Sequence, residues 1–353
     1  MSSVYLSGRG LACSLGLSLG ESLASLQRGA DSASSCFLPG AMGGEFPYHA
    51  IPGVRRDWNE RARALMQRVA DEAGASSARK GVLFIATSSF DIGAVEQGAT
   101  RMDYGAFADN VAGWLAWSGP VHVISTACTS SLNAVLAAHA MLKAGEAEEA
   151  LVLGVELDNR LTLGGFAALQ LLSRGSSKPF GRHRDGLVLG EAVAALRLTV
   201  GEPSRWKILG GANVVDGSQP TGASLSAVVD MYRSALATGG LAADEVDLIK
   251  VQAAGSPGND AVEAEAMREV FHAMPPLVSF KAAMGHTMGA SGAAEISLLT
   301  ASLDEGAWPA YRDDTDESLC VELARCAPGD ARRVMATILG FGGSHATVAL
   351  ERT

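Results

Sequence analysis

The sequence predicts an α/β protein built from two structurally related halves. Each half opens with a short β pattern that runs into a glycine-rich segment, and each contains a strand that ends at small residues just before a helix begins. Each half also closes with an apolar segment that contains glycine. With 353 residues, of which 48% are hydrophobic, the chain is long enough for one large domain or for two fused halves.

In the first half, residues 3–6 form the opening β pattern, and residues 8–16 are expected to be a glycine-rich turn. Residues 121–125 are rich in β-branched side chains and predict a strand, and a helix pattern follows from residue 129 to about residue 143. Residues 185–198 are apolar and contain glycine, which predicts a pair of strands that are buried on both faces.

The second half repeats this order. Residues 206–209 predict the opening strand, and a glycine-rich turn is expected at residues 210–217. A strand at residues 246–252 leads into a helix expected at about residues 260–271. Residues 334–351 predict the closing pair of buried strands.

The join between the halves is expected at residues 199–205, which hold Gly, Glu and Pro in succession. We therefore predict an N-terminal half at residues 1–200 and a C-terminal half at residues 201–353. Residues 40–53 and 307–328 are expected to be loops or cap segments.

Charge and cysteine content narrow the possible functions. The formal net charge of −10 at pH 7 argues against nucleic acid as a main partner, because phosphate binding needs a basic face. The five cysteines are odd in number and scattered, so neither a disulfide framework nor a zinc site is expected. The apolar residues 11–19 are interrupted by serine and glycine, unlike a signal peptide, and no run is long enough for a membrane span. We expect a cytoplasmic protein with no membrane partner.

Cys128 lies where the strand at residues 121–125 ends and the next helix begins. A thiol at a helix N-terminus faces the positive end of the helix dipole and unpaired backbone N–H groups, which lower its pKa. We therefore expect a nucleophile whose thiolate is populated near neutral pH. The alternative is a buried core cysteine, which is the usual fate of a free cysteine.

Five segments together resemble the β-ketoacyl synthase family, the condensing enzymes of fatty-acid and polyketide assembly. They follow the family's order and cover nearly the whole chain. The segments are STACTSSL around Cys128, GFAALQLLS at 165–173, KPFGRHRDGLVLGEAVA at 178–194, KAAMGHTMGASGAAE at 281–295 and GFGGSHA at 340–346. The resemblance implies a thiolase-like fold with five layers, αβαβα. It also implies a dimer, formed either by two copies or with another ketosynthase-like chain.

In this family a cysteine accepts an acyl chain from acyl carrier protein, and a malonyl unit loses carbon dioxide to give a carbanion that attacks the resulting thioester. The resemblance makes Cys128 that nucleophile and His286 one of two histidines that stabilise the enolate oxygen. Lys281 and Glu295 match the charged pair that flanks this histidine. Donors fixed in a dry site stabilise such charge far better than water does. No metal or organic redox cofactor is implied, since the phosphopantetheine arm arrives on the carrier protein.

The chain departs from the family at the other histidine. The stretch VQAAGSPGND at residues 251–260 has Ala254 in the histidine's position and is about two residues shorter than the family's pattern. Because an alanine side chain donates no hydrogen bond, we expect decarboxylation to be impaired. Two side chains are candidates to replace the donor, Ser256 in the same loop and His345 where the family usually has asparagine.

The resemblance also assigns residues around the substrate. Phe166 and Phe341 match aromatic positions that line and gate the acyl pocket, and core packing is the alternative for both rings. Gly340, Gly342 and Gly343 allow the backbone to approach the sulfur closely. The backbone N–H groups of Cys128 and Phe341 would then form the hole for the thioester oxygen.

Two sets of basic residues are candidates for a rim that receives the acidic carrier protein, although solvated faces are the commoner reading of such charges. His139 is expected to be a packing residue and His183 a surface residue, while Asp185 and Glu191 are expected to anchor a turn. The two basic sets are Arg174, Lys178, Arg182 and Arg184, and Arg61, Arg63 and Arg68.

Three functions fit these features. The preferred one is a condensing enzyme that uses Cys128 and His286. The second is an acyl transferase that loads Cys128 without efficient decarboxylation. The third is a non-condensing partner that resembles a chain-length factor and completes a heterodimeric ketosynthase. The retained Cys128 favours an enzyme, whereas Ala254 and the shortened loop favour the partner.

Overall fold

The computed structural model describes residues 3–29, 33–39, 43–53, 57–75, 79–99 and 103–353. Within these residues the chain forms one ten-stranded sheet and one three-stranded sheet. The large sheet runs, in spatial order, β11 (Leu277–Val278), β10 (Leu248–Lys250), β12 (Arg333–Leu339), β13 (Ser344–Arg352), β9 (Trp206–Val215), β1 (Val4–Cys13), β8 (Ala192–Val200), β6 (Glu149–Glu156), β4 (Val82–Ala86) and β5 (Val121–Ile124). The small sheet consists of β2 (Ser34–Leu38), β3 (Gly44–His49) and β7 (Leu189–Gly190).

The two halves of the large sheet repeat one strand order. When the strands of each half are numbered along the chain, both halves run third, second, fourth, fifth and first from the outer edge to the middle. In both, the two outer pairings are parallel and the two inner pairings are antiparallel. The halves meet where residues 4–6 of β1 pair with β9. This topology confirms two structurally related halves, while the boundary between residues 200 and 201 stays a prediction.

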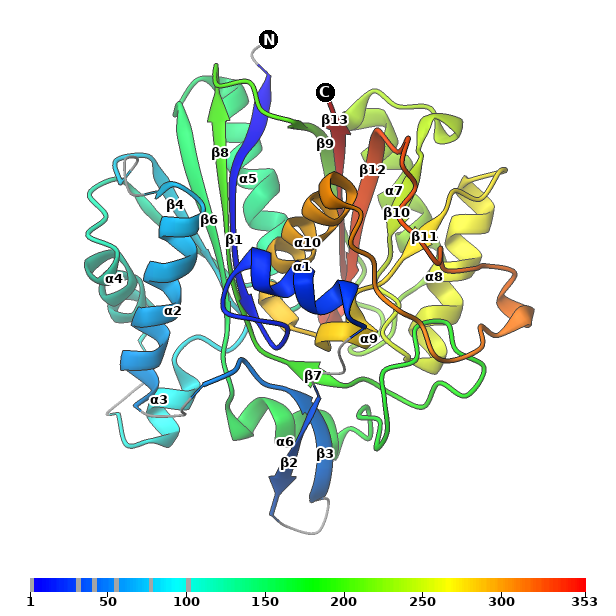
Figure 1. Ribbon diagram of the computed structural model, residues 1–353, viewed down its shortest axis with the longest axis horizontal. Coiled ribbons are helices and arrows are strands. Elements are labelled where there is room, and N and C mark those ends of the chain that lie inside the picture. The colour runs from blue at the N-terminus through cyan, green and yellow to red at the C-terminus, as the bar shows by residue number, and fades with distance from the viewer. Residues whose placement is uncertain (1–2, 30–32, 40–42, 54–56, 76–78, 100–102) are drawn as a thin grey trace.

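Helices form three layers around the two halves of the sheet (Figure 1). The central layer is α5 (Ser130–Ala144) and α10 (Ser291–Glu305), which pack in one apolar cluster with both halves of the sheet. Helices α2 (Trp58–Glu72) and α4 (Tyr104–Trp114) cover the outer face of the first half. Helices α7 (Leu225–Gly239) and α8 (Pro257–Val270) cover that of the second. The order of layers is αβαβα, as predicted.

The remaining helices are short or lie at the ends of the layers. They are α1 (Leu19–Gln27), α3 (Ile92–Glu96), α6 (Arg160–Ala168), α9 (Lys281–Met284), and the 3-10 helices η2 (Ala243–Glu245), η3 (Met288–Ala290), η4 (Glu317–Leu319) and η5 (Phe341–Gly343). Helix α10 is buried at every residue from Ser291 to Leu303, which its small and apolar composition allows. Glu295 is its one ionisable side chain in that stretch, and this carboxylate belongs to the site described below.

The predicted elements around Cys128 are confirmed. Strand β5 and helix α5 begin and end within one residue of the predicted bounds, because a β-branched run gives way there to alanine and leucine at helical spacing. In the second half, β10 is shorter than predicted and α8 begins three residues earlier, at Pro257. Proline suits the first turn of a helix because it has no N–H group to leave unpaired there.

The predicted glycine-rich turns at residues 8–16 and 210–217 are wrong over most of their length, because β1 and β9 continue through the glycines. A Cβ atom on Gly8 would lie 1.9 Å from the carbonyl oxygen of Ala73, and one on Gly10 would lie 2.0 Å from that of Val69. Both carbonyls belong to α2 or its C-terminal end. The glycines therefore let α2 lie directly against the strand rather than break it.

Two further segments differ from their predictions. Residues 185–198 contain one short strand, β7, which joins the small sheet, and most of one long strand, β8, which pairs antiparallel with both β6 and β1. Residues 40–53 contain β3 rather than a loop alone, and this strand pairs with β2 and β7. Residues 40–42 of this prediction lie outside the described residues. Residues 307–328 hold the short helix η4 and otherwise irregular structure.

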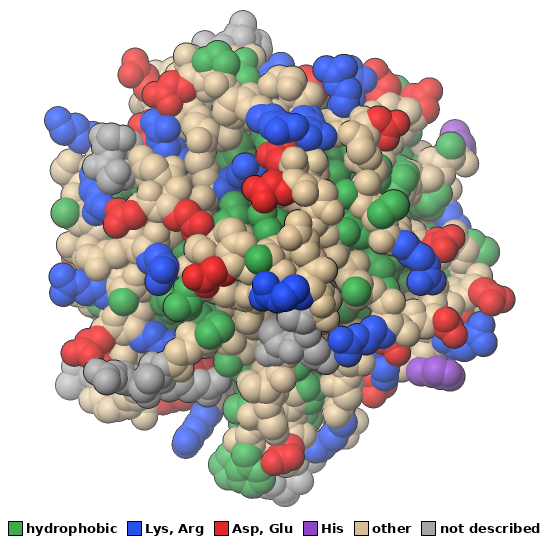
Figure 2. All heavy atoms as spheres, viewed as in Figure 1, with side chains coloured by type: hydrophobic (Ala, Val, Ile, Leu, Met, Phe, Trp, Pro, Cys, Tyr) green, Lys and Arg blue, Asp and Glu red, His purple; other side chains and the backbone are tan. Residues whose placement is uncertain are grey.

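The surface carries both signs of charge. On the face shown in Figure 2, basic and acidic side chains are interspersed rather than gathered into one patch. In the part of the chain that the structure describes, no helix combines the length and the apolar character needed to cross a membrane.

The close contact between β1 and α2 predicts that Gly10→Ala is strongly destabilising. The added Cβ meets a backbone oxygen that cannot rotate away, so we expect a loss of roughly 1–3 kcal/mol in the free energy of unfolding, measured by urea denaturation. Gly113→Ala in α4 is the matched control, since a Cβ there has no neighbour within 4 Å. It should be neutral or stabilising, because glycine in a helix costs conformational entropy. Equal stability of the two variants would contradict the close packing.

Candidate active site

Cys128 sits on a tight turn between β5 and α5. The turn is closed by the Ser130 hydroxyl, which donates to the carbonyl of Ala127 at 2.6 Å and accepts from the N–H of Thr126 at 3.0 Å. Ala127 adopts φ +53°, which is the left-handed region that non-glycine residues rarely occupy. This conformation places the next residue, Cys128, at the head of α5, with the sulfur facing the C-terminal half of the molecule.

The Cys128 Sγ lies 3.0 Å from Nε2 of His286, and both side chains are buried, at 4% and 2% exposure. Burial raises the pKa of the thiol to about 11, although the N–H of Phe341 and the charge of Lys281 act in the opposite direction. Glu156, a buried carboxylate, adds to the rise. Loss of hydration on burial therefore acts against the predicted thiolate at neutral pH and favours the protonated thiol. The sulfur is a thiol held against an imidazole.

Hydrogen bonds hold both the backbone and the ring of His286 in place. Its N–H donates to the carbonyl of Val188 at 2.7 Å, and its carbonyl accepts from Gly190 at 3.0 Å. Nδ1 lies 3.2 Å from the Ser291 hydroxyl, which in turn lies 3.2 Å from the hydroxyl of Thr287. Burial first, and then the charges of two lysines, hold the pKa of His286 well below its usual range. The imidazole is thus neutral at pH 7.

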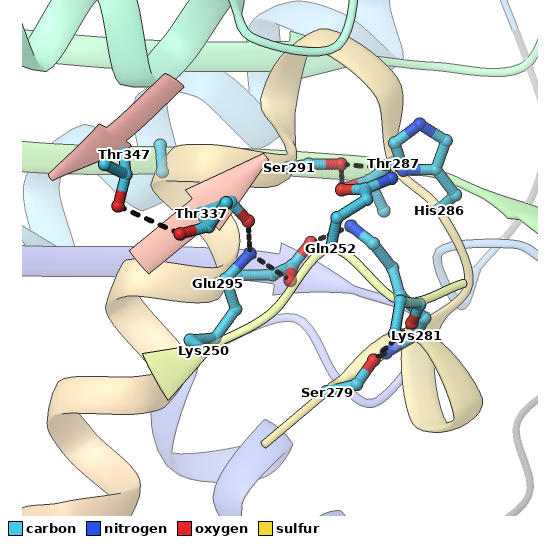
Figure 3. A network of polar contacts seen from close by, with 12 residues as sticks. Lys250, Gln252, Ser279, Lys281, His286, Thr287, Ser291, Glu295, Thr337 and Thr347 are labelled. Carbon is cyan, nitrogen blue, oxygen red and sulfur yellow. Dashed lines mark hydrogen bonds and ion pairs between the residues drawn. The ribbon is translucent and has the colours of Figure 1, made fainter. Parts of the chain in front are cut away.

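The two lysines share one buried carboxylate, as Figure 3 shows. Lys281 pairs with Oε1 of Glu295, and Lys250 donates to Oε2 at 2.9 Å. Lys250 also donates to the carbonyl of Thr337 at 2.6 Å. All three ionisable side chains are fully buried. Burial lowers the pKa of Lys250, and the charge of Glu295 opposes that shift.

Sequence reasoning placed Lys281 and Glu295 together, and the structure does so as well. It missed Lys250, Gln252 and Ser291. The signal for Lys250 was a lone lysine in the apolar segment 246–252, where a charge needs a buried partner. No pattern in the sequence singled out the other two.

The loop that carries Ala254 is fixed by two buried carboxylates. Glu263 accepts from the N–H groups of Gln252 and Ala253 at 2.7 and 2.8 Å. Asp260 accepts from the N–H groups of Ala254, Gly255 and Phe180, each within 3.2 Å. Burial raises the pKa of both carboxyls, that of Asp260 to about 6. Because α8 starts at once after Ser256, the shortened loop has little freedom.

A small cavity adjoins the sulfur. It measures about 10 Å³, which is near the lower limit for a single buried water molecule. Its walls include residues from both halves of the chain. The cavity is too small to be an acyl tunnel. The lining residues are Cys128, Leu187, Gln252, Ala254, Ser256, Asn259, Asp260, His286, Leu339 and Phe341.

The two phenylalanines that are predicted to gate the acyl pocket stack on each other. The rings of Phe166 in α6 and Phe341 in η5 stack with centroids 5.2 Å apart and planes 21° apart. Phe341 lines the cavity, whereas Phe166 lies behind it. Gly342 adopts φ +76°, and its N–H donates to the carbonyl of Pro220 at 2.8 Å. Gly340 donates to Ser344 at 2.8 Å, so both glycines shape the turn that brings Phe341 to the sulfur.

The two candidates for replacing the missing histidine differ in position. Ser256 lines the cavity together with Cys128. His345 is not among the residues that line it. Burial lowers the pKa of His345 to about 4, and among the described residues neither ring nitrogen has a hydrogen-bond partner.

The basic side chains proposed as a carrier-binding rim are mostly paired with acids. Arg61 forms a buried pair with Glu191, at 2.6 Å, and so anchors the chain instead of facing solvent. Arg63 and Arg68 are exposed. In the other set, three residues pair with acids and Arg174 stacks on Phe46. The pairs are Lys178 with Asp185, Arg182 with Glu317, and Arg184 with Asp316.

His139 is half-buried in α5, where burial lowers its pKa to about 4, and His183 is exposed. Across the described ranges, no three His, Cys, Asp or Glu side chains are grouped so that they hold a metal ion.

Comparison with known proteins identifies the family. Residues 66–202 match the sequence profile described as Beta-ketoacyl synthase, N-terminal domain, and residues 208–313 match the one described as Beta-ketoacyl synthase, C-terminal domain. The chain belongs to the β-ketoacyl synthase family. The first profile ends at residue 202, between β8 and β9, and the second begins at residue 208, near the start of β9.

Two curated synthases illustrate how far this likeness extends. The 3-oxoacyl-[acyl-carrier-protein] synthase 2 of Coxiella burnetii is 31% identical over 261 residues, which is 66% of this chain and 62% of that protein. The mitochondrial 3-oxoacyl-[acyl-carrier-protein] synthase of Arabidopsis thaliana is 28% identical over 262 residues, which is 66% of this chain and 56% of that protein. The matched part therefore spans less than two thirds of either synthase.

Solved structures of ketosynthases share the fold. A ketosynthase in complex with its chain length factor from Xenorhabdus doucetiae gives a TM-score of 0.85 at 23% identity, covering 100% of this chain and 98% of that chain. The ishigamide ketosynthase/chain length factor gives 0.89 at 22% identity, covering 100% and 99%. The fold is thiolase-like.

The raised pKa of Cys128 predicts a late titration of its thiol. Absorbance at 240 nm, taken as the difference between the wild type and Cys128→Ala, should show no thiolate at pH 9, where an ordinary cysteine is mostly ionised. The subtraction removes the contributions of the exposed Cys320 and Cys326. A difference signal that titrates below pH 8 would show a thiolate–imidazolium pair and contradict this geometry.

The shared carboxylate predicts that Glu295→Gln is severely destabilising. The variant leaves two buried ammonium groups without a counter-charge, so we expect the free energy of unfolding to fall by roughly 3–5 kcal/mol. Urea denaturation measures the change. Glu305→Gln, at the exposed end of the same helix, is the control and should stay within about 0.5 kcal/mol of the wild type. If both variants have the same free energy of unfolding as the wild type, the two buried lysines do not need the negative charge of Glu295, which would contradict this account.

Proposed function

We propose that this chain is an acyltransferase of the 3-oxoacyl-[acyl-carrier-protein] synthase type. It takes an acyl group from a carrier-protein thioester onto Cys128 and joins it to a unit derived from a malonyl thioester. The observation that supports this function is a 3.0 Å contact. It joins the Cys128 thiol, at the head of α5, to the neutral imidazole of His286. Backbone N–H groups of Phe341 and Cys128 face the same sulfur.

The first step is acyl transfer. Because the thiol is protonated at neutral pH, Nε2 of His286 acts as the general base and takes its proton as sulfur attacks the thioester carbonyl. The two backbone N–H groups stabilise the oxyanion of the tetrahedral intermediate. The carrier's sulfur then leaves and takes the proton back from His286, which leaves Cys128 acylated and the imidazole neutral.

The second step needs the imidazole in its other role, as a donor. Loss of carbon dioxide from the malonyl thioester leaves an electron pair that moves onto the thioester oxygen, and Nε2–H stabilises this enolate. Nδ1 must then accept a hydrogen bond. The Ser291 hydroxyl meets both needs, since a hydroxyl accepts from Nδ1–H in one tautomer and donates to Nδ1 in the other. The enolate carbon attacks the acyl thioester, and Cys128 leaves as a thiolate. This thiolate takes up one proton from solvent, which is the proton that the decarboxylative condensation consumes.

Substrate entry requires the closed cavity to open. The stacked rings of Phe166 and Phe341 stand where the family's gate stands, and their separation would admit the acyl chain to the sulfur. The phosphopantetheine arm of the carrier protein delivers each acyl group. No cofactor resident in the chain is part of the proposal.

The partner is a second ketosynthase-like chain, either a copy of this one or a different protein. In the described part of the chain, β5 has β4 on one side and no strand on the other. An edge strand beside the nucleophile presents unpaired backbone groups to another strand. Among the solved structures with the same fold are ketosynthases in complex with a chain length factor and with an acyl-carrier protein.

A second candidate function is that of a non-condensing partner in a heterodimeric synthase. Two observations favour it, the alanine at position 254 and a cavity too small for an acyl chain. In that role the chain would shape the acyl tunnel of a full synthase rather than carry the acyl group itself.

Intact mass spectrometry separates these functions. The full-length protein is mixed with acyl-carrier and malonyl-carrier thioesters, and the adduct on the chain and the release of carbon dioxide are followed together. The proposed enzyme gives an adduct that Cys128→Ala abolishes, with condensed product on the carrier. An adduct without product indicates an acyl transferase alone. No adduct, alone or with a second synthase-like chain present, overturns the enzymatic function and favours the non-condensing partner.

A further inference from the structure

One polar side chain in the cavity has no structural task. Gln252 follows β10, is 6% exposed, and lines the cavity together with Cys128, Ala254 and His286. Within the described residues its carboxamide Oε1 is buried and has no hydrogen-bond partner. A buried amide without a partner costs stability, so its presence beside the reacting sulfur calls for a ligand.

The backbone directs this side chain to the volume of the missing histidine. Residues 252 and 254 stand two apart in the chain and both line the cavity, so both side chains border the same space. The segment cannot turn away, because Glu263 accepts from the N–H groups of residues 252 and 253. The Ser279 hydroxyl also donates to the carbonyl of Ala253 at 2.8 Å. Figure 3 shows Gln252 beside the Lys281–Glu295 pair and on the same side as His286.

The size of the cavity fits this arrangement. A vacant imidazole site would leave far more space than about 10 Å³. Since only the methyl group of Ala254 projects there, other side chains fill the remainder. Among the described residues that line the cavity, Gln252 is the one with a buried amide oxygen that has no hydrogen-bond partner.

We propose that Gln252 is the second oxyanion donor of this synthase. Rotation of the carboxamide by 180° brings its Nε2–H to the place of the unpaired Oε1, and this N–H donates to the enolate oxygen while Nε2–H of His286 donates to the same atom. The carboxamide thus takes the role of the absent imidazole at position 254. The inference rests on the proposed function, because the enolate arises when the malonyl thioester loses carbon dioxide. Side-chain amides serve as oxyanion donors in other enzymes, and removing one such donor typically costs about a hundredfold or more in rate.

The test uses the full chain with acyl-carrier and malonyl-carrier thioesters and follows two signals. Intact mass reports acylation of Cys128, and carbon dioxide release reports decarboxylation. Gln252→Leu keeps the size of the side chain and removes the donor, so we expect carbon dioxide release to fall about a hundredfold. Acylation should stay at the wild-type rate. The variant should also unfold at a higher urea concentration, because it removes a buried unpaired amide.

A second pair of variants guards against a merely structural effect. Gln252→Ala should be as slow as Gln252→Leu, and adding Ala254→His to Gln252→Ala should restore release, because the imidazole then has both space and a donor. Ala254→His alone should not gain activity, since Gln252 fills the volume.

The proposal would be overturned, and the proposed function left intact, by one result. In that result the Gln252→Leu variant folds, is acylated and releases carbon dioxide at the wild-type rate. An acylated wild type that releases no carbon dioxide would also overturn it. Absence of acylation in the wild type would overturn both.

Discussion

The site depends on the contact between one thiol and one imidazole that are both buried away from bulk solvent. Removing water from Cys128 and His286 favours the neutral form of each, so the pair is held by a hydrogen bond rather than by an ion pair. A neutral imidazole is what both halves of a condensation require, first as a base and then as a donor. Burial of the two groups therefore sets which protonation states the chemistry starts from.

Such a site needs strong support, because it is surrounded by buried charge. Lys250, Lys281, Glu295, Asp260 and Glu263 all lie in the interior. Each has partners that offset the loss of hydration, either an opposite charge or several backbone N–H groups. These contacts join β10, α8 and α10, and with them the loops that carry Ala254 and His286. The charge cluster thus lies within the C-terminal half and fixes the loops of that half that face Cys128.

Sequence reasoning reached the fold class and the main residues because they depend on local patterns. The strand before Cys128, the helix after it and the five family segments are all readable from neighbouring residues. The glycines at positions 8 and 10 were misread as a turn, since only their contact with α2 explains them. The pKa of Cys128 was also misjudged. Leu187, His286 and Phe341 surround its thiol, and all three lie far from position 128 in the sequence. Gln252 was missed for the same reason, as its meaning comes from the cavity.

Nitrogen NMR of the protein labelled with ¹⁵N-histidine tests the central claim most directly, with His286→Gln assigning the signal. The account predicts a neutral imidazole at pH 7 and at pH 6, with one protonated and one unprotonated ring nitrogen. Two protonated nitrogens at these pH values would show an imidazolium beside a thiolate, and the account of a neutral, desolvated pair would be wrong.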